Sequence, residues 1–159
     1  MTDKNKAIIE YLLQCPQIQE SPLYFNFINA KDSTKQIITQ ADDVTLNRVY
    51  VDGSVAKRFT FTIIDFRSIS SQALVKIAGY DNENVEDLLD IQGIVDWISD
   101  QNDAKNYPNF GENCIIDEIR ATTNTPALNG IDNTISPPLA KYGVTIVILY
   151  IDTSRKIWK

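Results

Sequence analysis

The sequence predicts an α+β fold with a mainly antiparallel sheet, on the evidence of three patterns within its 159 residues. A helical pattern opens the chain, a β-rich run with an Asp-Gly turn follows it, and a second, acidic helical pattern precedes two more strands. Strands in runs, with helices set apart from them, are typical of α+β domains in which the helices pack on the sheet. No linker rich in glycine, serine or proline divides the sequence, so a single domain over residues 1–159 is expected.

The first element is a helix predicted over residues 3–15. Ile8, Leu12 and Cys15 fall on one stripe at helical spacing. Pro16 is expected to end this helix, because the residue before a proline avoids the α region. Two short strands are then predicted, at Leu23–Ile28 and at Lys35–Gln40.

The clearest hairpin pattern is Asp52-Gly53, which separates Arg48–Val51 from a β-rich run that reaches Phe66. A two-residue turn is expected here, because both of its positions need a positive φ. In the returning strand, Phe59, Phe61 and Ile63 share one face, and Arg58, Thr60 and Thr62 share the other. The alternation slips at Ile63-Ile64, which predicts either a bulge or a segment buried on both faces.

The second half of the chain contains one predicted helix and two predicted strands. Residues 84–101 have a broad apolar stripe at helical spacing, and Asn113–Ala121 follows as a strand. Gly143–Ile151 is apolar on both faces apart from Thr145. This last strand is therefore expected in the middle of the sheet, with something packed on each side.

The net charge of −6 is concentrated in one segment. Eight acids and no Lys or Arg lie between Asp81 and Asp103, so this segment carries −8 and the remainder +2. One interpretation is a solvated helix face. The other is a surface that repels an anionic polymer such as DNA inside a ring, which would make lumen acids of Glu86, Asp90, Asp96 and Asp100.

The composition also disfavours several function classes. An acidic chain opposes tight binding to a phosphate backbone and docking on anionic lipid. We see no signal peptide, and the longest apolar run is far below the roughly 20 residues that span a bilayer. The absence of histidine removes the commonest general base, and the two cysteines are too few for a disulfide scaffold. No cofactor motif is present, and none is expected to bind.

One constellation of acids keeps an enzymatic alternative open. Asp65, Asp117 and Glu118 lie on predicted strands, and Arg120 stands where some nucleases have a lysine. Carboxylates at such spacing hold Mg²⁺ in hydrolases. An acid–arginine pair that balances charge at a strand end explains the same residues.

The segment 121–142 fits no helix or strand period, although apolar residues and three prolines are spaced through it. Long unpatterned segments in compact domains tend to be functional or disordered. Two interpretations remain open: an arm that lies on another subunit, and a loop folded back over the sheet. The candidate contact residues are Asp52 and Gly53 on the hairpin and, on the arm, Asn124, Pro126, Leu128, Ile131 and Ile135.

Together these features resemble the tail terminator proteins of phages with long, non-contractile tails. The likeness is greatest to the branch from phages of Gram-positive hosts that is often labelled minor capsid protein. It covers roughly residues 1–153 and rests on the order of elements and on three stretches: Lys57–Arg67, the acidic helix from Glu83 to Asp100, and Cys114–Ile119 leading into the arm.

The resemblance implies a ring, usually of six copies, that caps the tail tube and stops its polymerisation. Its expected partners are its own copies, the tail tube protein and the head–tail connector protein, and DNA would cross the lumen without specific binding. It implies no catalysis and no membrane contact. The expected location is the head-proximal end of the tail in the virion, and the host cytoplasm during assembly. A connector-side head–tail joining protein is the alternative within the same class.

Overall fold

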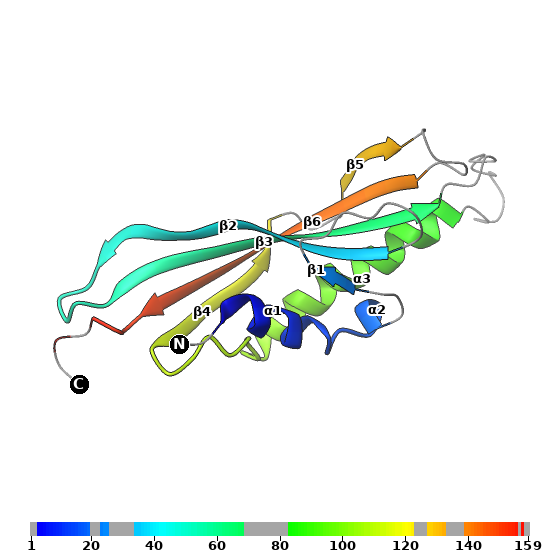
Figure 1. Cartoon of the computed structure of the whole chain (residues 1–159). Helices are drawn as coiled ribbons and strands as arrows, with labels where there is room; N and C mark the ends of the chain where they lie inside the picture. The colour runs from blue at the N-terminus through cyan, green and yellow to red at the C-terminus, as the bar shows by residue number, and fades with distance from the viewer. Residues whose placement is uncertain are drawn as a thin grey trace.

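The computed structural model describes residues 3–19, 23–25, 34–68, 83–122, 127–132, 139–155 and 157. These residues form an α+β fold with a mainly antiparallel sheet, as the sequence predicts (Figure 1). The elements follow one another in the order α1 (Lys4–Leu12), α2 (Pro16–Gln19), β1 (Leu23–Phe25), β2 (Thr34–Val49), β3 (Val55–Ser68), α3 (Glu83–Asp103), β4 (Cys114–Ala121), β5 (Ala127–Asp132) and β6 (Leu139–Asp152).

The strands pair in the order β1-β2-β3-β6-β4, and β5 pairs with β6. Among the described strands, only β1 and β2 pair in parallel. β6 is the central strand: β3 pairs with its whole length, β4 with its C-terminal half and β5 with its N-terminal residues 139–143. The predicted central position of the last strand is therefore confirmed.

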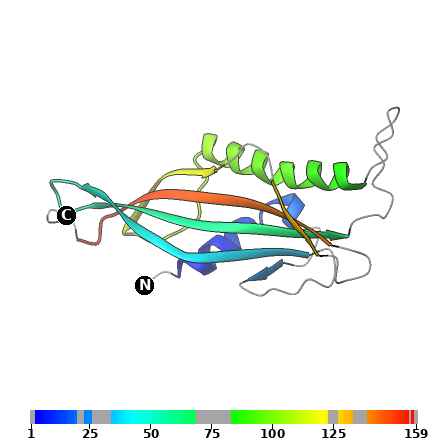
Figure 2. The same ribbon diagram turned by 90° about the horizontal axis from the view of Figure 1, so that it is seen from above.

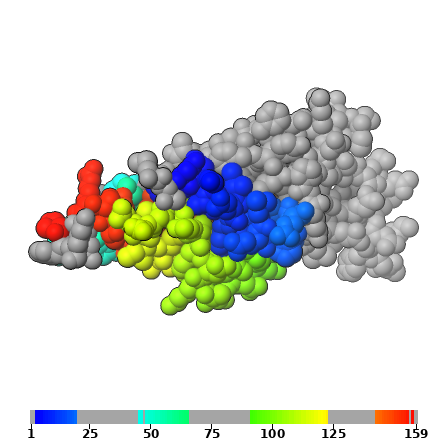
Figure 3. Space-filling model, turned by 60° about the horizontal axis from the view of Figure 1, so that its bottom comes forward, coloured from blue at the N-terminus to red at the C-terminus, as the bar shows by residue number. Residues whose placement is uncertain are grey.

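Strand alternation decides which face of the sheet carries the core. All three helices of the described part lie on one face (Figures 1 and 2). Phe61, Ile146 and Ile148 point to that face and are fully buried. Figure 3 looks onto the helix layer, where α1 and α2 lie beside α3. The helices contribute buried side chains at helical spacing, among them Ile8, Leu12, Ile18, Ile91, Ile94 and Ile98.

The first helix ends earlier than the sequence predicts, and a second short helix follows it. Asp3 caps α1, its carboxylate accepting the backbone N–H of Asn5 at 3.0 Å. α1 ends at Leu12, and Pro16 then begins a second short helix instead of a loop. This placement is physically favourable because proline is tolerated at the first position of a helix, where its missing N–H has no partner to lose.

The apparent phase slip at Ile63-Ile64 is a doubly buried segment. β3 pairs with β6 without a register shift, and Ile63, Ile64 and Asp65 are all buried. The bulges lie instead in the pairing of β2 with β3, between Thr39 and Asp42 and between Thr45 and Val49. Of the two expectations, burial on both faces is the correct one.

The second face of the sheet is covered unevenly along β6. Val147 in the middle of the strand is buried, whereas Leu149 and Ile151 near its end are half-buried and the neighbouring Ile115 is 58% exposed. The prediction of cover on both faces is therefore confirmed for the middle of β6 and wrong for its C-terminal end. No helix of the described part covers that end on the second face.

The hairpin turn differs from the two-residue turn that the sequence predicts. The N–H of Gly53 donates to the carbonyl of Tyr50 at 3.0 Å, and the N–H of Tyr50 donates to the carbonyl of Ser54 at 2.8 Å. Of these loop residues only Gly53 has a positive φ, of 89°. This geometry is a three-residue loop with a glycine bulge, which needs one left-handed residue instead of two.

The expectation that 121–142 lacks strand structure is wrong for part of its length. Ala127–Asp132 forms β5 and pairs with residues 139–143 of the chain's own β6. Over β5, the chain therefore folds back on its own sheet, as one of the two interpretations expects. Only one edge of β6 near its start was left for such a strand, because β3 takes the other edge and β4 pairs only from Ile146 onward.

The outer edge of β4 is closed by side chains of the same chain. The Oδ1 atom of Asn102 accepts the N–H of Ile119 at 3.0 Å, and the hydroxyl of Tyr107 donates to the carbonyl of Asp117 at 3.2 Å. Covering an edge in this way removes backbone groups that another strand would otherwise pair with. The end of α3 and the segment after it therefore protect this side of the sheet.

Candidate assembly surface at the hairpin end

The structure separates the predicted contact residues instead of bringing them together. Asp52 and Gly53 lie in the loop between β2 and β3, next to the C-terminal end of β6. Leu128 and Ile131 lie on β5, which pairs with the opposite end of β6, and their side chains fall outside the described residues. The remaining candidates also lie outside the described residues: Asn124, Pro126 and Ile135.

The hairpin projects beyond the helix layer (Figure 1). It carries uncovered apolar side chains. Val49 is 72% exposed, Tyr50 43% and Val51 90%. Exposed apolar patches on a protein surface are typical of contact sites for another molecule. We call Val49, Tyr50 and Val51 the hairpin tip.

A groove lies beside the hairpin tip, with a volume of about 460 Å³. We call it the terminal groove. Its walls come from three separate parts of the chain, and most of its side chains are apolar: Tyr50, Val51, Asp52, Ser54, Ile115, Ile151 and Thr153. Among these residues, the sequence predicts a contact role only for Asp52. The available signal was the apolar run Val49-Tyr50-Val51 beside a turn, where polar residues are usual.

Backbone contacts hold the loop in place below the tip. The carboxylate of Asp52 accepts the N–H of Ser54 at 3.0 Å, and its carbonyl accepts the N–H of Ile157 at 2.6 Å. The C-terminal segment therefore lies against the loop. A Cβ atom added to Gly53 would collide with the backbone carbonyl of Arg155.

Gly53→Ala is therefore expected to loosen the hairpin end. The positive φ and the collision with Arg155 together should cost about 1–3 kcal/mol of unfolding free energy. Urea titration measures this loss, and hydrogen exchange should show faster exchange of the Ile157 amide. Gly93→Ala is the matched control: there the added Cβ meets only the movable side chain of Gln17, and the gain in helix propensity opposes the cost. Equal stability of Gly53→Ala and wild type would contradict the expectation.

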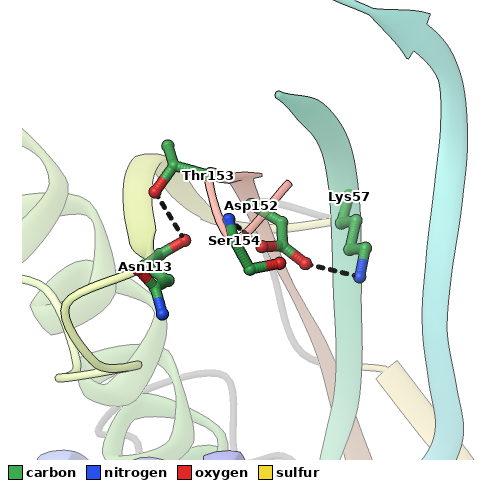
Figure 4. A network of polar contacts seen from close by, with 5 residues as sticks. All are labelled: Lys57, Asn113, Asp152, Thr153 and Ser154. Carbon is green, nitrogen blue, oxygen red and sulfur yellow. Dashed lines mark hydrogen bonds and ion pairs between the residues drawn. The ribbon is translucent and has the colours of Figure 1, made fainter. Parts of the chain in front are cut away.

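A polar network ties the end of β6 to its neighbours (Figure 4). Lys57 donates to the Asp152 carboxylate at 2.8 Å, and the N–H of Ser154 donates to the same carboxylate at 2.9 Å. Thr153 donates both its N–H and its hydroxyl to the carbonyl of Asn113, at 2.8 and 3.1 Å. These contacts join β3, β6 and the turn before β4 next to the hairpin.

The network predicts an acid-sensitive contribution to stability. Burial alone raises the pKa of Asp152, but the hydrogen bonds from Lys57 and Ser154 outweigh it and hold the pKa well below its usual 3.8. Because the folded pKa lies below the unfolded one, this contribution is present above about pH 4 and is lost as the pH falls further. Urea unfolding from pH 7 to pH 2 should show a shallower acid decline for Asp152→Asn than for wild type. Asp100→Asn removes an exposed acid of α3 as a control, and identical slopes for wild type and Asp152→Asn would refute the assignment.

The predicted lumen acids lie on α3. Asp96 and Asp100 are exposed on the side of this helix that faces away from the sheet. The amide of Gln92 donates to the carboxylate of Asp96 at 3.1 Å. The side chains of Glu86 and Asp90 lie outside the described residues.

The acids of the enzymatic alternative are not brought together. Asp65 is buried in β3 and pairs with Tyr142, whereas Glu118 pairs with Leu149 on the other side of β6. Seven residues along β6 correspond to about 24 Å. Asp117 is exposed at a bulge, and Glu118 pairs with Arg120 at 3.6 Å. The acids of the magnesium alternative therefore do not form one site, and the described residues contain no group of three acids or cysteines able to hold a metal.

No protein-family model matches the sequence, and no curated protein matches it. Of the helices in the described part, none has the length and apolar character needed to cross a membrane.

Proposed function

We propose that this chain is a structural virion protein, a ring-forming tail terminator that caps the tail tube of a long-tailed phage. The proposal combines the resemblance of the sequence with a surface found in the structure. The α+β fold agrees with the fold that the resemblance implies. The protein would act by shape, through contacts with its own copies, the tube protein and the head–tail connector protein.

The observation that carries this proposal is the apolar hairpin end. Val49 and Val51 are more exposed than any other large apolar residue of the described part, and a groove lies beside them. In an isolated domain, valines exposed at the tip of a hairpin contribute no free energy of burial. In an assembly they do contribute, because the neighbouring subunit buries these side chains.

The distribution of charge is compatible with a DNA-conducting ring. Six copies of a chain with a net charge of −6 carry about −36, which disfavours retention of a phosphate backbone. The exposed acids Asp96 and Asp100 lie on α3, whereas the apolar hairpin tip follows β2. Subunit contact and repulsion of DNA are thus assigned to different surfaces.

The test is inactivation of the gene in the phage genome that carries it, followed by electron microscopy of the lysate. Overlong tails without heads are expected, and supply of the intact gene in trans should restore tails of uniform length. Tails of normal length in the mutant lysate would refute the terminator proposal. Tails of normal length that fail to join heads would favour the connector-side joining protein instead.

A further inference from the structure

We propose that the hairpin tip of one copy packs into the terminal groove of the next copy, head to tail. The inference rests on the proposed ring and names the contact that holds neighbouring copies together. The hairpin tip supplies the apolar side chains, with Val51 at its apex. The terminal groove supplies the apolar wall, with Ile115 as its most accessible residue outside the hairpin tip.

The hairpin tip cannot fill the terminal groove of its own molecule, because Tyr50 and Val51 are part of the groove wall. A hairpin tip that enters this groove therefore comes from another molecule. Among the described residues of the groove lining, one is charged: Asp52, whose carboxylate accepts the N–H of Ser54. An apolar occupant matches the apolar part of this lining, and the hairpin tip has that chemistry.

A ring in which the β2 side of each copy faces the β4 side of the next places these two features next to each other. Copies in a ring are related by rotation about one axis, so all hairpin ends lie at one level. The hairpin tip directly follows β2, whereas Ile115 lies at the start of β4, on the opposite side of the sheet. The tip of one copy thereby meets the groove of its neighbour.

Exposed side chains of opposite charge stand beside the two features. Arg48 is exposed on β2 next to the hairpin tip. Glu112 is exposed just before β4, and Asp117 is exposed on β4. A head-to-tail contact brings Arg48 toward these acids, whereas a contact between like sides brings equal charges together. This complementarity favours a second copy of the chain as the occupant.

The contact is made by side chains and not by a sheet that continues from copy to copy. Asn102 and Tyr107 already bond the backbone of β4 at Ile119 and Asp117. A strand from a neighbour would have to break these bonds. Packing of the hairpin tip against Ile115 leaves them intact.

Val51→Asp and Ile115→Asp, one on each side of the contact, test the proposal in the purified full-length chain. Analytical ultracentrifugation over a range of concentrations should show self-association of wild type and at least tenfold weaker association of either variant. Leu13→Asp is the matched control, because Leu13 is 45% exposed on the helix side, and it should associate like wild type. Circular dichroism confirms folding, since all three positions are exposed. A monomeric wild type, or variants that associate like wild type, would overturn the proposal.

Charge reversal tests the head-to-tail direction. Arg48→Glu and Glu112→Arg should each weaken association at low salt, by up to about fivefold, and the two changes in one chain should restore it. A double variant that associates no more tightly than the more weakly associating single variant would overturn the head-to-tail arrangement. The outcomes remain separable from the terminator proposal. If the Val51→Asp and Ile115→Asp variants form normal rings, only the proposed contact is rejected. If these variants lose association but tails keep their normal length after gene inactivation, only the terminator role is rejected.

Discussion

Ile148→Asp is expected to abolish cooperative folding. Ile148 is fully buried in β6, where it pairs with Phe59 on one side and Ile119 on the other, beneath the helix layer. A carboxylate there loses its hydration without a partner, at a cost of several kcal/mol added to the lost apolar packing. Native domains have an unfolding free energy of about 5–15 kcal/mol, so this single change removes most or all of that free energy. Circular dichroism on heating should show no cooperative transition.

The neighbouring residue provides the control for this prediction. Leu149 follows Ile148 in the same strand, points to the opposite face and is half-buried. Leu149→Asp introduces the same charge into β6, yet the carboxylate remains hydrated, so a folded protein with a cooperative transition is expected. A folded Ile148→Asp would show that the helix layer does not seal this face of the sheet.

Phe61→Ala is expected to produce the next largest loss of stability. Phe61 is fully buried in β3, and its ring centroid lies 6.4 Å from that of Phe59. Truncation to alanine removes apolar burial and leaves a cavity, which typically costs about 3–5 kcal/mol. For a domain of this length the midpoint of thermal unfolding should fall by roughly 6–20 °C. Urea titration and calorimetry both measure the change.

Tyr50→Ala serves as the comparison for Phe61→Ala, since it also replaces an aromatic ring. Tyr50 is 43% exposed at the hairpin tip, outside the core. Its truncation should change the unfolding free energy by less than about 1 kcal/mol. Similar losses for the two variants would mean that the hairpin end contributes to the core, and would argue against its assignment as an uncovered surface.

Most of the secondary structure could be predicted because it depends on neighbouring residues. The helical stripe over 84–101 and the apolar run over 143–151 correspond to α3 and to most of β6. β2 was the exception: only 35–40 and the end near 48 were expected, whereas the strand runs from Thr34 to Val49. Bulges break its pairing with β3, and a broken pairing leaves no regular alternation to detect.

The turn and the arm were mispredicted for a shared reason. Asp52-Gly53 is compatible with more than one type of hairpin loop. In the three-residue loop found here, the loop also contacts the C-terminal segment. The residues of β5 have no strand period of their own, and they pair because one edge of β6 is vacant beside them. The loop contacts a segment about 100 residues away in sequence, whereas β5 pairs with the strand that follows it. In both cases the pairing partner decides the form and local propensity does not.

By itself, the sequence determined the α+β class, the amphipathic helices, the central strand and the concentration of acid in one helix. These follow from periodicity and composition, which are properties of consecutive residues. Only the tertiary structure decided that Asp65 lies far from Asp117 and Glu118, and that Val51, Ile115 and Ile151 border one groove. The physical reason is strand pairing: β6 brings β3 and β4 to its two sides, and the registers on those sides fix which side chains meet.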